Sequence, residues 1–124
     1  MGVKVLNTGI SAFTINSHFS DKDPVVRKIY DKLIKSIGRF GPTVEEPKKT
    51  SIHIVNKTAL AGVATRKTHL VLTVKSDRKL VSSRIHKSQQ TSSSRFHNEI
   101  KLSSPAEVDD ELIRWLKAAY LLSA

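Results

Sequence analysis

The hydrophobic pattern of the chain changes its period twice, and this change constrains the fold more than any other feature. In residues 51–55, 69–75 and 95–102, apolar and polar side chains alternate, which is typical of strands with one buried face. On either side of this region, apolar residues recur three and four positions apart, as in amphipathic helices. The order predicts an α+β domain in which the N-terminal and C-terminal helices pack on one face of an antiparallel sheet of four to five strands.

Each predicted helix has recognisable end signals. The first is predicted to begin where Asp23, an N-cap residue, precedes Pro24, and to end at Gly41-Pro42. The second is predicted to begin at a capping box formed by Ser104 and Glu107. The predicted buried stripes are Val26, Ile29, Leu33, Ile37 and Phe40 in the first helix, and Val108, Leu112, Trp115 or Leu116, Ala119 and Leu122 in the second.

Two further strands are predicted between the helices. Residues 59–64 have small side chains, which allow either a ligand or a helix to approach the backbone closely. Residues 80–90 are predicted to form a fifth strand, joined through a hairpin at 91–94 to the strand that follows.

The pleat of the predicted strands sorts their side chains between two faces. The face toward the helices should carry Ile52, Ile54, Leu70, Leu72, Val74, Phe96, Ile100 and Leu102. The opposite face should carry Ser51, His53, His69, Val71, Thr73, Lys75, Arg95, His97, Glu99 and Lys101. The second set is polar and largely cationic, so we expect a basic sheet face that the helices leave open.

Charge and composition bound the domain organisation. Residues 48–101 hold twelve Lys and Arg against two acidic residues, which equals the formal net charge of +10 of the whole chain. We expect residues 1–17 to be a tail or an extra strand, residues 18–124 to form a single domain, and Glu45-Glu46 to lie in a solvated loop. The absence of cysteine excludes disulfides and cysteine-ligated metals and agrees with a cytoplasmic protein.

Four segments of the chain together resemble a known family. They are HFSDKDPVVRKIYDKLI at 18–34, EEPKKTSIHIV at 45–55, RKTHLVLTVKSDRKL at 66–80 and RFHNEIKLSSPAEVDDELIRWLKAAYLLS at 95–123. In this order they resemble the prokaryotic family of domain of unknown function 5655. The resemblance implies a small α+β domain and brings no established activity and no catalytic residues. Some relatives carry a cysteine-rich segment before the His-Phe pair, and this chain has no cysteine there.

The segregated positive charge predicts a partner with negative charge, with nucleic acid first and other phosphate-bearing ligands next. Few aromatic residues are expected on the surface, which counts against base stacking. The predicted anion-binding residues are Lys48, Lys49, Ser51, His53, Arg66, Lys67, Arg84, Lys87, Arg95, His97 and Lys101. A solvated basic surface without a dedicated ligand is the simplest alternative.

Other hypotheses belong to different functional classes. A small phosphate-ester hydrolase or transferase would use His53 and His97 as acid and base, although neither His is followed two residues later by Ser or Thr, as in two-histidine phosphoesterases. His53, His97 and Glu99 would suit a zinc or iron ion, but neighbouring cations disfavour one. A non-catalytic protein-interaction domain is a further alternative. We expect no catalytic residue, metal, cofactor or membrane association.

Overall fold

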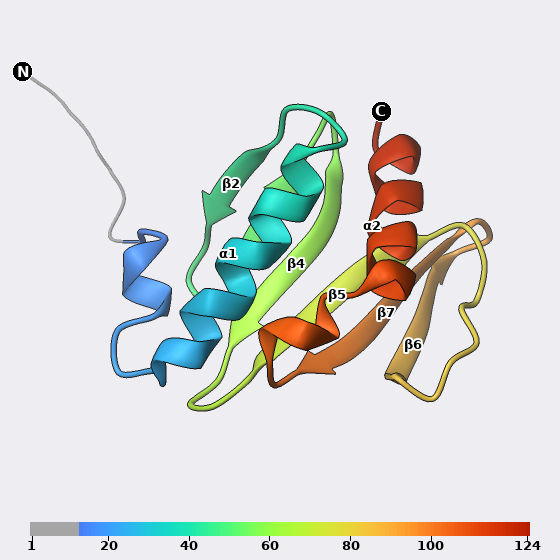
Figure 1. Cartoon of the computed structure of the whole chain (residues 1–124). Coiled ribbons are helices and arrows are strands. Elements are labelled where there is room, and N and C mark those ends of the chain that lie inside the picture. Colours follow the sequence, from blue (N-terminus) through green and yellow to red (C-terminus); the bar gives the residue numbers. More distant parts are fainter. Residues whose placement is uncertain (1–12) are drawn as a thin grey trace, which may run out of the picture.

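The computed structural model describes residues 13–124, in which two helices cover one face of a six-stranded sheet (Figure 1). The predicted α+β class is therefore confirmed, with one strand more than expected. In chain order, the elements are the 3₁₀ turn η2 (Asn16–His18), helix α1 (Pro24–Gly38), strands β2 (Val44–Pro47), β3 (Ile52–Val55), β4 (Ala59–Thr65), β5 (Leu70–Ser76), β6 (Ile85–Ser92) and β7 (Arg95–Leu102), the 3₁₀ turn η3 (Pro105–Glu107) and helix α2 (Asp110–Leu122).

The strands lie in the order β2-β3-β4-β5-β7-β6, and all neighbouring pairs are antiparallel. Tight connections join β2 through β5 in sequence, and β6 and β7 form a hairpin in which β7 pairs with β5. The bounds of β3, β4, β5 and β7 agree with the predicted strands to within one residue. Strand β6 begins later than predicted, because residues 80–84 belong to the connection that leads to the sheet edge.

The core lies between the helices and the covered face of the sheet. In β5, buried and half-buried residues alternate, so that Leu70, Leu72 and Val74 point to the helices. All the predicted core positions of the strands are buried except Phe96, which is half-buried; Asn98, two residues later on the same face, is fully buried instead. Helix α2 packs on β4 and β5 and against α1. The opposite face of the central strands has no helix over it (Figure 1).

Local hydrogen bonds explain where the helices begin. The Asp23 carboxylate accepts a hydrogen bond from the backbone N–H of Val25 at 3.0 Å, with Pro24 at the first helical position, as predicted. The predicted capping box of Ser104 and Glu107 forms, but it caps η3. Helix α2 has its own N-cap, Asp109, whose carboxylate accepts from the N–H of Leu112 at 3.1 Å. The predicted start of the second helix was therefore too early.

The extra strand is β2, where the sequence predicted a solvated loop. Its four residues pair with β3, with Glu45 opposite Ile54 and Glu46 opposite His53. The hydroxyl of Tyr30, a buried residue of α1, donates a hydrogen bond to the Glu45 carboxylate, which ties this edge strand to the helix layer. Residues 13–15 lead into η2, and none of residues 13–17 belongs to a strand; the rest of the predicted tail or extra strand lies outside the described residues.

Candidate functional site

The register of the sheet brings the polar face residues into two adjacent rows. His53, Gly62, Thr73 and Glu99 lie opposite one another across β3, β4, β5 and β7. In the next row, Lys75 of β5 lies opposite His97 of β7. Opposed residues of neighbouring strands point to the same face, so His53 and His97 share the face that the helices leave open.

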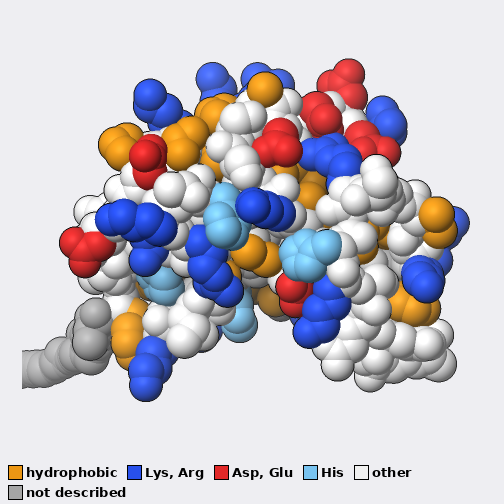
Figure 2. Space-filling model, turned by 90° about the horizontal axis from the view of Figure 1, so that it is seen from below, with side chains coloured by type: hydrophobic (Ala, Val, Ile, Leu, Met, Phe, Trp, Pro, Cys, Tyr) orange, Lys and Arg blue, Asp and Glu red, His pale blue; other side chains and the backbone are white. Residues whose placement is uncertain are grey.

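Two adjoining cavities lie here, one over the open face and one at the end of the sheet beside α2. The first cavity, which we call the floor cavity, has a volume of about 250 Å³ and lies over β4. Its lining includes Ser51, His53, Gly62, Thr73, Lys75 and His97. The second, of about 190 Å³, is lined by residues that include Thr58, Lys75, Thr91, Arg95, His97 and Ser123; we call it the end cavity. They share Ala59, Lys75 and His97. Figure 2 looks along the sheet from the end that holds the turn between β4 and β5. The side away from the helices is notched in this view, with Lys, Arg and His side chains and a carboxylate beside the notch, and the end cavity lies at the opposite end of the sheet.

The end cavity is bounded by the turn between β3 and β4 and by the last turn of α2. The backbone N–H groups of Lys57 and Thr58 donate to the carbonyl of Ser123 at 3.2 and 3.1 Å. The side-chain amide of Asn56 donates to the carbonyl of Tyr120 at 3.4 Å. These bonds satisfy carbonyls at the negative end of the helix dipole and fix the turn against α2. The donated N–H groups also partly offset the negative potential of the helix end, which would otherwise repel an anion.

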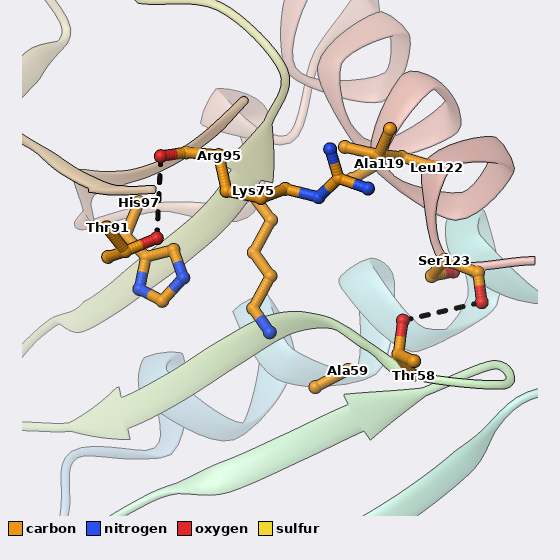
Figure 3. A pocket seen from close by; sticks show the side chains of 9 residues that line it. All are labelled: Thr58, Ala59, Lys75, Thr91, Arg95, His97, Ala119, Leu122 and Ser123. Atoms are coloured by element: carbon orange, nitrogen blue, oxygen red, sulfur yellow. Dashed lines mark hydrogen bonds between the residues drawn. The ribbon is translucent and has the colours of Figure 1, made fainter. Parts of the chain in front are cut away.

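Two cations extend into the end cavity. Figure 3 shows Lys75 reaching across the hollow toward Ala59 and Thr58, while Arg95 extends toward Ala119 and Leu122 of α2. The Arg95 guanidinium donates to the carbonyl of Ser94 at 2.8 Å. Within residues 13–124, neither Lys75 nor Arg95 forms an ion pair with a carboxylate. Arg95 has a weak electrostatic interaction with Asp77, but no carboxylate contacts either cation directly, so both can contact a bound anion.

His97 forms the wall between the two cavities. Burial, assisted by the positive charge of Lys75, lowers the pKa of its imidazole below the usual value. His97 is therefore neutral at neutral pH and can accept or donate a hydrogen bond there. An anion bound beside it would offset the charge of Lys75 and favour the protonated ring.

The structure brings together four of the eleven predicted anion-binding residues. Ser51, His53, Arg95 and His97 line the joined cavities. The others lie elsewhere: Lys48 and Lys49 in the loop between β2 and β3, Arg66 and Lys67 in the turn between β4 and β5, Lys87 in β6, Lys101 near the end of β7, and Arg84 beside α2. The basic stretch of the sequence is thus divided over several surfaces.

Arg84 holds two parts of the fold together. Its guanidinium donates to Asp109 at 2.8 Å, to Glu111 at 3.2 Å and to the backbone carbonyl of Glu107 at 2.6 Å. The hydrogen bond from Arg84 also holds the pKa of the Asp109 carboxyl below its usual range. With its donors engaged in this way, Arg84 connects the loop before β6 to the start of α2, and it does not line either cavity.

A second basic cluster lies at the opposite end of β5 and β7. Burial, followed by the charges of Lys101 and Arg66, lowers the pKa of His69. The cluster is separated from Lys75 and His97 by Glu99, which lies in the row between them and contacts His86 of β6 at 3.4 Å. The open face therefore carries positive charge at both ends with a carboxylate between.

The geometry does not favour the catalytic or metal arrangements. Strands β4 and β5 separate His53 from His97, and three strand spacings combined with an offset of two residues along the strands amount to about 16 Å. The two imidazoles are thus on opposite walls of the floor cavity instead of side by side. Residues 13–124 contain no group of three His, Asp or Glu side chains placed to hold a metal ion, so His53, His97 and Glu99 do not converge as a ligand set.

Lys75, Thr73 and Thr58 line the cavities but were not among the residues selected from the sequence. Gly62 was not selected either, although it lies in the segment 59–64 whose small side chains predicted close approach of a ligand or a helix. Alternation placed Lys75 and Thr73 on the open face, but nothing in the sequence marked them above the other polar residues there. The strand register supplies the missing information, because it sets Lys75 beside His97 and Gly62 between His53 and Thr73.

Comparison with known proteins gives a family without an activity. Neither helix that the structure describes, α1 or α2, has the length and apolar character needed to cross a membrane. No curated protein and no solved structure matches the chain significantly. A family model described as "Domain of unknown function (DUF5655)" matches residues 15–123. This match covers nearly all of the sequence and agrees with the resemblance of its four segments, and the chain therefore belongs to the DUF5655 family.

Proposed function

We propose that this protein binds a phosphate-bearing ligand in the end cavity, through Lys75 and Arg95. The observation that carries the proposal is the pairing of two cations without carboxylate partners in one hollow of about 190 Å³. Lys and Arg donate charge-assisted hydrogen bonds to phosphate oxygens. The hydroxyls of Thr58 and Thr91 line opposite sides of this cavity (Figure 3). They donate to the carbonyls of Ser123 and Arg95 at 3.5 and 3.4 Å, long bonds that can be exchanged for bonds to phosphate oxygens.

The charge distribution favours a short ligand over a nucleic acid strand. A strand that followed the open face from Arg95 toward Lys101 would pass Glu99, whose carboxylate repels phosphates. Proteins that bind single strands usually offer exposed aromatic rings for base stacking, and no aromatic residue other than histidine lines either cavity. A ligand whose phosphate stays at the Lys75 end avoids the repulsion from Glu99.

Titration with inorganic pyrophosphate tests this proposal. Amide NMR shifts at 50 mM salt should change around Lys75, Arg95 and Thr58, with affinity weakened at 200 mM because counterions screen the cations. Lys75→Ala and Arg95→Ala should each weaken binding about tenfold, the scale of one hydrogen bond to a charged group. Lys79→Ala, which removes the same charge from an exposed position outside both cavities, should leave binding nearly unchanged.

Two outcomes would overturn the proposal. One is the absence of pyrophosphate binding at 50 mM salt, and the other is equal weakening by all three substitutions, which would indicate a diffuse charge effect. A single-stranded RNA of about ten nucleotides should bind no more tightly per phosphate than pyrophosphate. Tighter RNA binding that also depended on Lys101 would point to a nucleic acid surface in place of a site for a small ligand.

A further inference from the structure

The two cavities differ in the chemistry of their walls. The end cavity has cations and hydroxyl groups, whereas the floor cavity lies over Ala59, Ala61, Gly62 and Ala64, the small residues of β4. The floor therefore offers little more than the backbone of one strand. A flat group that rests there contacts peptide planes and methyl groups, while a group in the end cavity meets positive charge.

Gly62 is the residue that keeps the floor open. A Cβ atom added at this position would have no heavy atom within 4 Å, so neither packing nor steric conflict requires glycine here. Glycine in the interior of a strand weakens it and often marks a place where a ligand approaches the backbone. Gly62 lies between His53 and Thr73 in the sheet, so the missing side chain opens space between two hydrogen-bonding groups.

The spacing of the walls suits a planar ring. His53 and His97 are about 16 Å apart at the backbone, three strand spacings across the sheet and two residues along it, and the intervening floor cavity of about 250 Å³ is larger than a nucleobase requires. The hydroxyls of Ser51 and Thr73 and the two imidazoles lie around it. Such groups can donate or accept hydrogen bonds at the edge of a heterocycle whose face rests on the backbone of β4.

We infer that the ligand is a mononucleotide, with its base over Gly62 in the floor cavity and its phosphate beside Lys75 and Arg95 in the end cavity. This inference rests on the proposed function and adds the recognition of the ring. Lys75 and His97 are opposed on neighbouring strands and line both cavities, so a ligand that extends from one cavity to the other passes over both side chains. The phosphate is attracted by the charges of Lys75 and Arg95, and the ring contacts the backbone of β4 in the floor cavity, which a simple anion does not reach.

A comparison of AMP, UMP and ribose 5-phosphate by calorimetry at 50 mM salt tests the contribution of the ring. At least one of the two nucleotides should bind ten or more times as tightly as ribose 5-phosphate. Gly62→Val should reduce that nucleotide's affinity to the level of ribose 5-phosphate and leave ribose 5-phosphate binding unchanged. Gly38→Val is the matched control, because an added Cβ there also meets no atom within 4 Å but lies at the end of α1.

The possible failures separate the two proposals. If ribose 5-phosphate and pyrophosphate bind through Lys75 but neither nucleotide binds more tightly, the nucleotide inference is wrong and the phosphate site stands. If none of these compounds binds, both are wrong. Amide NMR of the wild-type protein provides a test that does not depend on the folding of a variant: AMP or UMP must shift the Gly62 amide signal, and ribose 5-phosphate must not.

Discussion

The two faces of the central strands show how one alternating sequence serves two purposes. On the covered face of β5, Leu70, Leu72 and Val74 are fully buried under the helices. On the open face of the same strand, Val71, Thr73 and Lys75 are only half-buried. Burial of apolar area stabilises the fold on the first face, whereas the side chains of the second face are free to serve binding. Stability and binding are therefore expected to respond to different substitutions in a single strand.

The largest effect on stability is expected from Leu72, which lies between Val63 and Ile100 on the covered face with no exposed surface. Leu72→Ala should lower the free energy of unfolding by about 2–5 kcal/mol, because it removes buried methyl groups and leaves a cavity. The matched substitution Val71→Ala, one residue away on the open face, should cost less than about 1 kcal/mol. Urea unfolding followed by circular dichroism measures both, and equal losses would contradict the contrast between the faces.

An intermediate effect is expected from Asn98, the one polar strand residue that is fully buried among residues 13–124. Its amide donates to the carbonyl of Val74 at 2.9 Å and to the Ser76 hydroxyl at 3.0 Å, and it accepts from the Ser88 hydroxyl at 2.9 Å. Asn98→Ala should lower the free energy of unfolding by about 1–3 kcal/mol, because buried partners lose their hydrogen bonds.

Ser88→Ala provides the matched comparison for Asn98, since it removes one of the three hydrogen bonds and leaves the amide in place. The same urea experiment should give a loss smaller than that of Asn98→Ala. A loss of equal size would mean that the bond between Ser88 and Asn98 accounts for the whole effect. If neither substitution lowered the free energy of unfolding, the buried hydrogen bonds of Asn98 would not stabilise the fold. The proposal that stability depends on the covered face would then be weakened.

The sequence predicted the covered face well because burial imposes a regular pattern. Alternation identified β3, β4, β5 and β7 and nearly all their core residues. It missed β2, because Val44–Pro47 is too short for alternation to be recognised and contains Pro47 and two acidic residues. Its strand pairing and the bond from Tyr30 to Glu45 are tertiary contacts. Phe96 was misjudged for a related reason: it points to the helix side but lies where the cover is incomplete.

The candidate site was only partly predictable, because charge along a sequence does not determine which cations come together. Arg84 and Arg95 are both basic residues in the same stretch, yet Arg84 is engaged by Asp109 and Glu111, and Arg95 is not paired with a carboxylate in the described part of the chain. The acidic start of α2 is distant in sequence from β6. Only the packing of that helix against the sheet decides which cation it neutralises.

The smallest effect is expected from protonation of the open face. Burial and the charge of Lys75 lower the pKa of His97 in the folded protein, while the unfolded chain retains the usual value of about 6.5. Between these two values the unfolded state binds more protons than the folded state. Stability is therefore complete above about pH 6.5 and decreases as the pH falls through the lowered pKa of the folded state.

His97→Gln should flatten the decrease in the free energy of unfolding between pH 7 and pH 5.5, because Gln keeps a polar group in the wall but does not titrate. Lys75→Ala should flatten it partly, since it removes the neighbouring charge and leaves the burial of His97. His69 contributes a decrease of the same sign through burial and the charges of Lys101 and Arg66, so some slope should persist in both variants. Urea unfolding at a series of pH values measures the slope. If His97→Gln left the wild-type slope unchanged, protonation of His97 would not contribute to the pH dependence of stability, and the slope would have to come from other groups such as His69.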